Sequence, residues 1–192
     1  MVVKRLDLGG GAGYMTLGQH SFTTVDLENG DIIHDLRDTP LPFPDNSVEV
    51  IHCSATLEHL LKQEAINLIK DCYRILEPGG VLTLMVPDMD IFIEGHLTGD
   101  WSKHPEGTLL TSDLNYCAGS SEFPRDHPWS HKYLWCFESL AYVLEKTGFV
   151  DIVKHGHYDS PHKHLFPEAY NIDQTTIGLY IDAIKPINKE KN

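Results

Sequence analysis

The stretch Asp7-Leu8-Gly9-Gly10-Gly11-Ala12-Gly13 decides the fold of this chain. It directly follows the apolar residues 1–3 and Leu6, a pattern that predicts a buried strand ending in a loop. Glycine tolerates positive φ and has no Cβ, so a ligand can approach the main-chain N–H groups of such a loop closely. In open α/β sheets, ligands bind at the carboxyl ends of the strands. The stretch therefore indicates a nucleotide-like cofactor.

Beyond the loop, hydrophobic patterns predict alternating strands and helices. Apolar residues recur at helical spacing in residues 60–76, and the Pro78-Gly79-Gly80 turn ends this helix. Residues 81–86 are almost uniformly apolar, as in a central strand with both faces covered. Strand, helix, turn and strand in this order imply a parallel α/β crossover. The remaining expected elements are strands at residues 22–26, 31–34, 48–53, 150–155 and 176–184 and a helix from residue 137 to residue 147.

The composition indicates which kinds of binding partner and which compartment suit the protein. A formal net charge of −13 opposes binding to a phosphate backbone, because nucleic-acid affinity comes mostly from Lys and Arg. The four cysteines form no C-x-x-C pair, which indicates reduced core thiols and a cytoplasmic protein. The longest apolar run, residues 81–86, is far shorter than the roughly 18 residues of a membrane span, and no signal peptide precedes it. We expect a single domain over residues 1–187, with a polar tail at 188–192, acting on a small molecule away from membranes and nucleic acids.

Three classes of cofactor site use a glycine turn between a strand and a helix. A P-loop requires Gly-Lys-Ser/Thr, but Gly13 is followed here by Tyr14-Met15. The dinucleotide pattern G-x-G-x-x-G fits Gly9 and Gly11 but meets Tyr14 where close packing needs a small residue. The sequence therefore disfavours both a P-loop and an NAD enzyme.

The pattern Asp7-x-Gly9-x-Gly11-x-Gly13 instead resembles motif I of the class I S-adenosylmethionine-dependent methyltransferases. The similarity extends to residue 88. It is carried further by Leu41-Pro42-Phe43-Pro44-Asp45-Asn46-Ser47, Leu57-Glu58-His59-Leu60 and Tyr73-Arg74-Ile75-Leu76-Glu77-Pro78-Gly79-Gly80. This ordered set looks like the small-molecule branch that includes ubiquinone/menaquinone-type and sugar-pathway enzymes.

The resemblance implies a fold and an activity. The fold is a three-layer Rossmann-like α/β sandwich with a mostly parallel seven-stranded sheet and an antiparallel last strand. The activity is transfer of a methyl group from S-adenosylmethionine to an oxygen, nitrogen or carbon atom of a small-molecule acceptor by in-line displacement, with S-adenosylhomocysteine as product.

The resemblance also implies which residues bind the cofactor. The backbone of Gly9, Gly11 and Gly13 would lie against its methionine and ribose portions, and Asp7 would fix that loop or reach the ammonium group. Asp26, at the end of the second strand, would accept hydrogen bonds from the ribose hydroxyls.

The adenine would meet a second group of residues. The resemblance implies that the Asp35 carboxylate accepts a hydrogen bond from the exocyclic amine and that the Leu36 side chain packs on the ring face. It also implies that the Cys53 backbone contacts the cofactor. An aspartate at a strand end also serves as a turn or helix cap. For Asp26 and Asp35, this structural interpretation stays open beside cofactor binding.

Methyl transfer rests mainly on positioning and desolvation, and a base helps when the acceptor is a hydroxyl or ammonium group. His59 follows the fourth strand and is the first candidate for that base. His131 is the second and lies close to His127 and Tyr133 in the irregular residues 88–135, which we expect to form a lid or substrate-binding insertion. Each histidine also has a plainer interpretation, as a helix cap or an exposed side chain.

Further histidines raise the question of a metal. The pairs His155-x-His157 and His162-x-His164 would each share a face on a strand and could bind an ion. No H-E-x-x-H or C-x-x-C element accompanies them. We therefore expect no metal site.

The first helix and the start of the chain leave a second hypothesis open. Residues 14–20 allow a helix of two turns at most, and the chain begins within its first strand. The expected lid, or a second subunit in a homodimer or a partner complex, would then close the cofactor site. The alternative to an enzyme is a non-catalytic cofactor-binding or partner subunit with a degenerate methyltransferase fold. The glycine triad and Asp26 argue against it, because a scaffold has no need of them.

Overall fold

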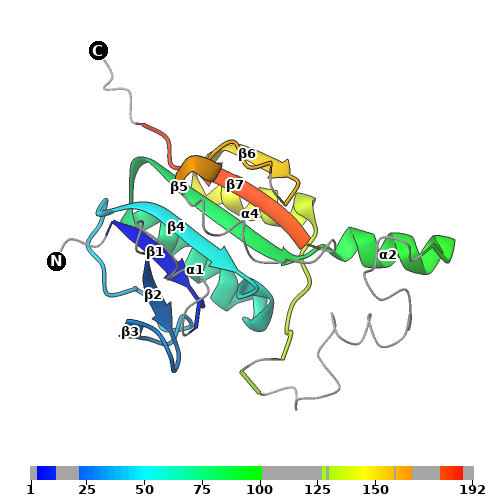
Figure 1. Ribbon diagram of the computed structural model, residues 1–192, viewed down its shortest axis with the longest axis horizontal. Helices are drawn as coiled ribbons and strands as arrows, with labels where there is room; N and C mark the ends of the chain where they lie inside the picture. Colours follow the sequence, from blue (N-terminus) through cyan, green and yellow to red (C-terminus); the bar gives the residue numbers. More distant parts are fainter. Residues whose placement is uncertain are drawn as a thin grey trace.

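One mixed β-sheet forms the centre of the computed structural model (Figure 1). The structure describes residues 4–11, 22–100, 127–128, 130–157, 159–165 and 178–187. The strands are β1 (Arg5–Leu8), β2 (Thr23–Asp26), β3 (Ile32–Ile33), β4 (Val48–Ser54), β5 (Leu76–Pro87), β6 (Val150–His155) and β7 (Gly178–Ile184). Their order across the sheet is β3-β2-β1-β4-β5-β7-β6.

The strand directions match the predicted sheet. Strands β3, β2, β1, β4 and β5 pair in parallel, whereas β7 runs antiparallel to both β5 and β6. The expected mostly parallel seven-stranded sheet with an antiparallel last strand is therefore confirmed. Because β1, β2 and β4 are parallel neighbours, their carboxyl ends meet at one edge, where the glycine loop begins.

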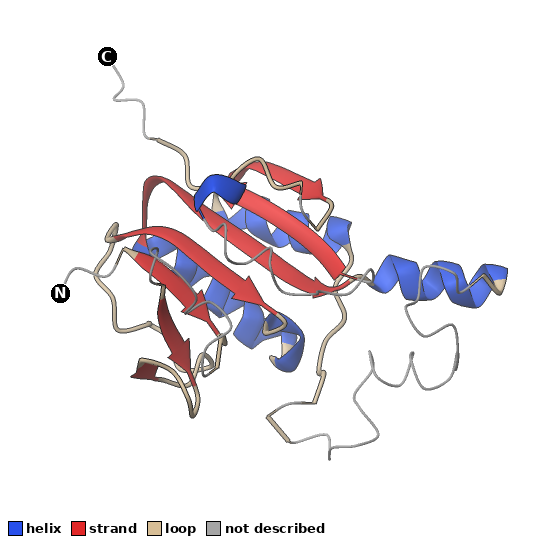
Figure 2. Cartoon of the chain, in the orientation of Figure 1, coloured by secondary structure: helices blue, strands red, loops and turns tan. Residues whose placement is uncertain are grey.

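Two amphipathic helices cover one face of this sheet. Helices α1 (Lys62–Ile75) and α4 (Phe137–Thr147) lie next to each other behind the strands (Figure 2). Their apolar side chains, among them Leu68, Ile69 and Leu144, are buried in one core with the strand residues. Two 3₁₀ turns, η1 (Leu57–His59) and η2 (Lys163–Leu165), follow β4 and β6.

The end of α1 differs slightly from the prediction. The helix was expected to reach residue 76 and to be followed by a turn, but it ends at Ile75, and Leu76 already has the extended dihedral angles of β5. Pro78 disfavours the helical region for the residue before it, which promotes the early change. Gly79 takes a φ of 85° and donates a hydrogen bond to the Lys185 carbonyl oxygen, so the turn is part of the sheet.

The proline-rich residues 40–46 form the expected structured loop, held by a side chain of α1. Arg74 donates hydrogen bonds to the carbonyl oxygens of Leu41 and Phe43, and its Nε lies 2.6 Å from the Asp71 carboxylate. Asp71 in turn accepts a hydrogen bond from the Leu41 amide. This network fixes the loop between β3 and β4.

Segment 88–135 leaves and rejoins the sheet at one point. Asp88 and Trp135 form an isolated parallel bridge, and the Met89 amide donates to the Trp135 carbonyl oxygen. Helix α2 (Met89–Thr98) starts at Asp88, which caps it through Oδ1, and extends away from the sheet (Figure 1). The two ends of the segment are therefore adjacent, whereas residues 101–126 and 129, on which the predicted lid or insertion depends, lie outside the described residues.

Candidate functional site

The glycine loop follows β1 and needs its glycines for two different reasons. Gly9 has a φ of 78°, and a Cβ there would lie 2.1 Å from Oγ1 of Thr56, so the loop packs directly on the chain beyond β4. Gly11 has a φ of 54°, and no described atom lies within 4 Å of where its Cβ would be. Gly11 therefore presents bare backbone to open space, as a cofactor loop requires. The predicted Gly13 lies outside the described residues.

Asp7 supports this loop from inside. Its side chain is buried, and Oδ1 lies 2.9 Å from Nδ1 of His52 on β4. A Cβ at Gly10 would lie 2.0 Å from Oδ2, so the loop backbone passes directly over the carboxylate. His52 was missed by the sequence interpretation, although parallel pairing of β1 with β4 places it opposite Asp7.

Asp26 joins the loop to the end of β2. Its Oδ2 accepts a hydrogen bond from the Gly11 amide at 3.1 Å, and Oδ1 accepts one from the Glu28 amide at 3.0 Å. The structure thus brings together two residues, Gly11 and Asp26, that the sequence assigned to the same ligand. The Asp26 carboxylate thus lies beside the open backbone at Gly11.

The predicted adenine residues lie one strand further along. Asp35 accepts hydrogen bonds from the Arg37 backbone amide and from Nε of its guanidinium at 3.0 and 2.9 Å. The Arg37 side chain is the main reason why the pKa of Asp35 lies below its ordinary value. Leu36 is buried in the core. No sequence pattern indicated the contact between Asp35 and Arg37. This contact keeps the Asp35 carboxylate ionised and occupies it with hydrogen bonds from Arg37.

Cys53 occupies the end of β4 with its thiol in the interior. The side chain is buried, and burial raises its pKa well above the ordinary value, so the thiol is neutral and unreactive. The predicted contact of the Cys53 backbone with the cofactor stays a prediction. Two residues later, Ala55 has a φ of 49°, which is unusual for a residue with a Cβ.

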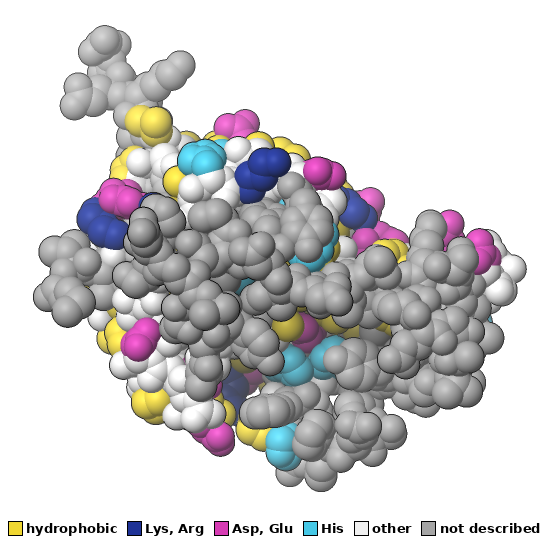
Figure 3. All heavy atoms as spheres, in the orientation of Figure 1, with side chains coloured by type: hydrophobic (Ala, Val, Ile, Leu, Met, Phe, Trp, Pro, Cys, Tyr) yellow, Lys and Arg dark blue, Asp and Glu magenta, His cyan; other side chains and the backbone are white. Residues whose placement is uncertain are grey.

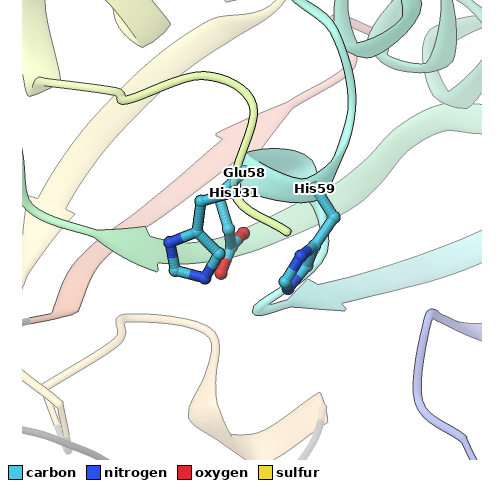
Figure 4. A group of neighbouring side chains, drawn as sticks. All are labelled: Glu58, His59 and His131. Atoms are coloured by element: carbon cyan, nitrogen blue, oxygen red, sulfur yellow. The ribbon is translucent and has the colours of Figure 1, made fainter. Parts of the chain in front are cut away.

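His59 and His131, the two predicted catalytic residues, lie together (Figure 4). Their ring centroids are 4.8 Å apart and the ring planes are inclined by 76°. Glu58 joins them: one ligand atom from each of the three side chains lies within 4.8 Å of the others. We call Glu58, His59 and His131 the β4 cluster. In the space-filling view, histidine and acidic side chains gather near the centre of this face (Figure 3).

Backbone hydrogen bonds assemble the β4 cluster from two distant segments. The Lys132 amide donates to the Glu58 carbonyl oxygen at 2.7 Å, which fixes the residues after His131 against η1. The His59 amide donates to the Thr56 carbonyl oxygen at 3.0 Å, which shapes η1 itself. Because Thr56 also packs on Gly9, the cluster and the glycine loop share one support.

Burial controls the charge of the β4 cluster. It raises the pKa of Glu58 to about 8. It also lowers the pKa of His131 to about 4, with smaller contributions from His59 and Lys132. Near neutral pH, Glu58 is therefore largely protonated and His131 is neutral. Sequence analysis noted Glu58 only as part of the Leu57-Glu58-His59-Leu60 match and gave it no role.

The other histidines and Tyr133 lie apart from the β4 cluster or serve packing. Tyr133 stacks edge-on against Trp135, and the His127 carbonyl oxygen accepts a hydrogen bond from Lys132 Nζ. His155 faces Asp182, whereas His157 stacks on Tyr180. Within the described part of the chain, neither C-terminal histidine pair belongs to a group of three metal-binding side chains.

No helix among the described residues is long and apolar enough to cross a bilayer.

Comparison with known proteins supports the resemblance to methyltransferases that the sequence motifs indicate. Residues 6–84 match the family model described as a methyltransferase domain. A probable S-adenosylmethionine-dependent methyltransferase of Mycolicibacterium smegmatis is 32% identical over 94 residues, which cover 49% of this chain and 31% of that protein. A ubiquinone/menaquinone biosynthesis C-methyltransferase of Shewanella halifaxensis is 26% identical over 78% of this chain and 67% of its own length. The matched part of the chain thus spans 31% and 67% of the lengths of these two relatives.

Solved structures share the fold. A S-adenosylmethionine-dependent methyltransferase from Archaeoglobus fulgidus superposes with a TM-score of 0.60 at 18% identity, covering 96% of this chain and 87% of that one. The sheet order, the glycine loop and these similarities agree on a single cofactor, S-adenosylmethionine. In sequence and in fold, the chain is therefore similar to the S-adenosylmethionine-dependent methyltransferases.

Proposed function

We propose that this chain transfers a methyl group from S-adenosylmethionine to a small-molecule acceptor. The observation that carries the proposal is the hydrogen bond between the Gly11 amide and Asp26 at 3.1 Å, beside loop backbone that no described side chain covers. It places a carboxylate and bare backbone together at the carboxyl ends of β1 and β2, where a nucleoside fits.

The proposed cofactor contacts follow from this edge. The backbone of Gly9, Gly11 and Gly13 contacts the methionine and ribose portions of the cofactor. Asp26 accepts hydrogen bonds from the ribose hydroxyl groups. Asp7 holds the loop, and its Oδ2 has no hydrogen-bond partner among the described residues, so it can also face the ammonium group. Asp35, Leu36 and the Cys53 backbone complete the adenine end, where Arg37 keeps Asp35 ionised and so able to accept from the exocyclic amine.

His59 and His131 serve the acceptor in this proposal. Bound S-adenosylmethionine supplies a methyl group that is already activated by the sulfonium. The acceptor's nucleophilic atom forms its bond to the methyl carbon as the carbon–sulfur bond breaks, and the β4 cluster, to which both histidines belong, assists loss of the acceptor's proton. The lid or substrate-binding insertion that the sequence predicts over residues 88–135 would exclude water from the acceptor, and its residues 101–126 and 129 lie outside the described residues.

Charge and cysteine usage support the remaining parts of the proposal. The net charge of −13 favours a small molecule over a nucleic acid as acceptor, and the buried, unpaired Cys53 and Cys72 suit the cytoplasm. A homodimer or a partner subunit that closes over the glycine loop is compatible with the open space at Gly11.

Isothermal titration calorimetry with S-adenosylmethionine and S-adenosylhomocysteine tests the proposal. The wild type should bind both, and Asp26→Ala should bind at least tenfold more weakly, a loss of about 1.4 kcal/mol or more. Glu145→Ala, an exposed carboxylate on α4, is the matched control and should bind like the wild type. Absence of binding by the wild type would overturn the proposed function, and equal affinity of Asp26→Ala would overturn the role of Asp26.

A further inference from the structure

Glu58 is a buried carboxyl group with an unused oxygen. Its side chain is 2% exposed, and Oε2 has no hydrogen-bond partner among the residues that the structure describes. Burying a polar group without a partner costs about 1 to 3 kcal/mol, and the cost is higher for a charged group. A ligand that engages this oxygen would offset that cost, which makes Glu58 a candidate for ligand binding.

The two neighbours of Glu58 offer nitrogen atoms in a fixed arrangement. The imidazole rings of His59 and His131 stand nearly perpendicular, with centroids 4.8 Å apart, and the donor atoms of all three side chains lie within 4.8 Å of one another. Figure 4 shows the three side chains extending from η1 and from the returning segment toward the same side. Small side-chain rotations bring three such atoms to a common ion.

Backbone contacts hold this arrangement in place before any ligand arrives. Glu58 and His59 are adjacent on η1, and the Lys132 amide ties the residue after His131 to the Glu58 carbonyl oxygen at 2.7 Å. The donors therefore come from two segments that are already joined. A preformed set loses less side-chain entropy on binding than donors on loose loops.

A cation explains the three side chains better than a pair of bases does. Two imidazoles can take a proton from an acceptor without a third ligating group beside them. A divalent ion uses all three groups, since it binds neutral imidazole and ionised carboxylate and supplies the charge that a buried carboxylate lacks.

We propose that Glu58, His59 and His131 bind one divalent transition-metal ion, which presents its open coordination positions to the methyl acceptor. The proposal rests on the proposed methyltransferase function and names how the β4 cluster serves it. Two imidazole nitrogens and one carboxylate oxygen favour Mn²⁺, Fe²⁺, Co²⁺ or Zn²⁺ over Mg²⁺, which prefers oxygen ligands. Three protein ligands leave positions open, as in catalytic rather than structural sites.

The ion narrows the class of acceptor. An acceptor hydroxyl at an open position loses its proton to water more readily, because the bound cation lowers its pKa. The oxygen then forms its bond to the methyl carbon, while the carbon–sulfur bond breaks and its electron pair stays on sulfur. The acceptor is therefore an oxygen nucleophile, and the transfer is an O-methylation.

A second group of metal-binding side chains carries no such inference. Asp90, Cys136 and Glu138 also lie within ligand distance of one another, but Asp90 and Glu138 are exposed, and exposed groups of this kind are satisfied by water.

The test is a titration of the full chain with Co²⁺, followed by visible absorption, and with Mn²⁺, followed by calorimetry. The wild type should bind one equivalent, and Glu58→Gln and His131→Asn should each lower the affinity at least tenfold. His96→Asn, an exposed histidine on α2, is the matched control and should bind like the wild type. No ion binding by the wild type, or equal binding by wild type, Glu58→Gln and His131→Asn, would overturn the site.

A parallel titration with S-adenosylhomocysteine separates this inference from the proposed function. The three variants should keep wild-type affinity for it, which also shows that they are folded. Cofactor binding without ion binding would overturn the metal site and leave the proposed function standing. Ion binding without cofactor binding would overturn the proposed function and the assignment of the ion to methyl transfer.

Discussion

Two of the buried groups of carboxyl and histidine side chains in the described part of the chain are in opposite states of ionisation. In the first, the β7 cluster of Asp182, His155 and Ser160, the Ser160 hydroxyl donates to Oδ2 of Asp182, and Nε2 of His155 lies 3.2 Å from Oδ1. Although burial alone would raise the pKa of Asp182, its contacts with His155 and Ser160 hold it below the ordinary value. The carboxylate is ionised and buried, with the Ser160 hydrogen bond at Oδ2 and the ion pair with His155 at Oδ1.

In the β4 cluster, burial has no such compensation. Burial raises the pKa of Glu58 to about 8, and Oε2 has no hydrogen-bond partner among the described residues. A carboxyl group beside a histidine thus forms a stabilising network in the β7 cluster. In the β4 cluster, it leaves a buried carboxyl oxygen without a hydrogen bond, which is destabilising. We infer that the β7 cluster stabilises the fold, whereas the β4 cluster is kept for chemistry. Each experiment below can break or sharpen that distinction.

The largest expected effect is on turnover. His131→Asn should lower the rate of methyl transfer by about 10²- to 10⁴-fold, because it removes a group that acts on the acceptor's proton directly or through an ion. Steady-state assays with an acceptor found by screening measure this, and cofactor affinity should not change. His155→Asn, in the β7 cluster, should keep the turnover of the folded fraction. Equal losses of turnover in the two variants would erase the distinction.

The next effect is on stability. Asp182→Ala should lower the free energy of unfolding by about 3 to 5 kcal/mol, because it leaves His155 and Ser160 buried without their carboxylate partner. Urea titration monitored by circular dichroism measures the change, and Ser160→Ala, which removes one hydrogen bond, should cost less. A loss below about 1 kcal/mol for Asp182→Ala would mean that the β7 cluster does not stabilise the fold.

A smaller effect is on the pH dependence of stability. Burial lowers the pKa of His155, but the contact with Asp182 outweighs it and raises this pKa above the ordinary 6.5. The histidine therefore stabilises the fold fully below pH 6.5, and this contribution is lost as pH rises through the pKa of the folded state. The pKa of Asp182 is lowered from 3.8, so its contribution is present above pH 3.8 and lost as pH falls through the folded value. The stability difference between wild type and His155→Gln should therefore be larger at pH 5.5 than at pH 8.5. The opposite trend in urea titrations would show that the pair is not ionised.

The sheet and the glycine loop were accessible from sequence because they depend on local patterns. Apolar periodicity located the strands and α1, and the spacing of Gly9, Gly11 and Asp26 predicted two neighbouring strand ends, which the structure brings within hydrogen-bond distance. Local chemistry was sufficient here, since positive φ and the absence of a Cβ are properties of single residues.

The partners of the site residues were not accessible in the same way. His52 meets Asp7 only through the register of β1 and β4, and Arg37 engages Asp35 through a loop conformation that no periodicity encodes. Glu58 was read as part of a family motif, because its burial depends on the return of residue 131 to η1 from far along the chain. Long-range packing, which the sequence pattern does not express, decides which carboxyl groups keep their charge.

The central claim is that Glu58 serves function at the expense of stability, and the free energy of unfolding of Glu58→Met tests it most directly. Urea titration without S-adenosylmethionine or divalent ions should show a stability equal to that of the wild type or about 1 kcal/mol higher, because the unused buried oxygen is gone. A loss of about 3 kcal/mol, like that expected for Asp182→Ala, would contradict the claim and make the β4 cluster a part of the structural core.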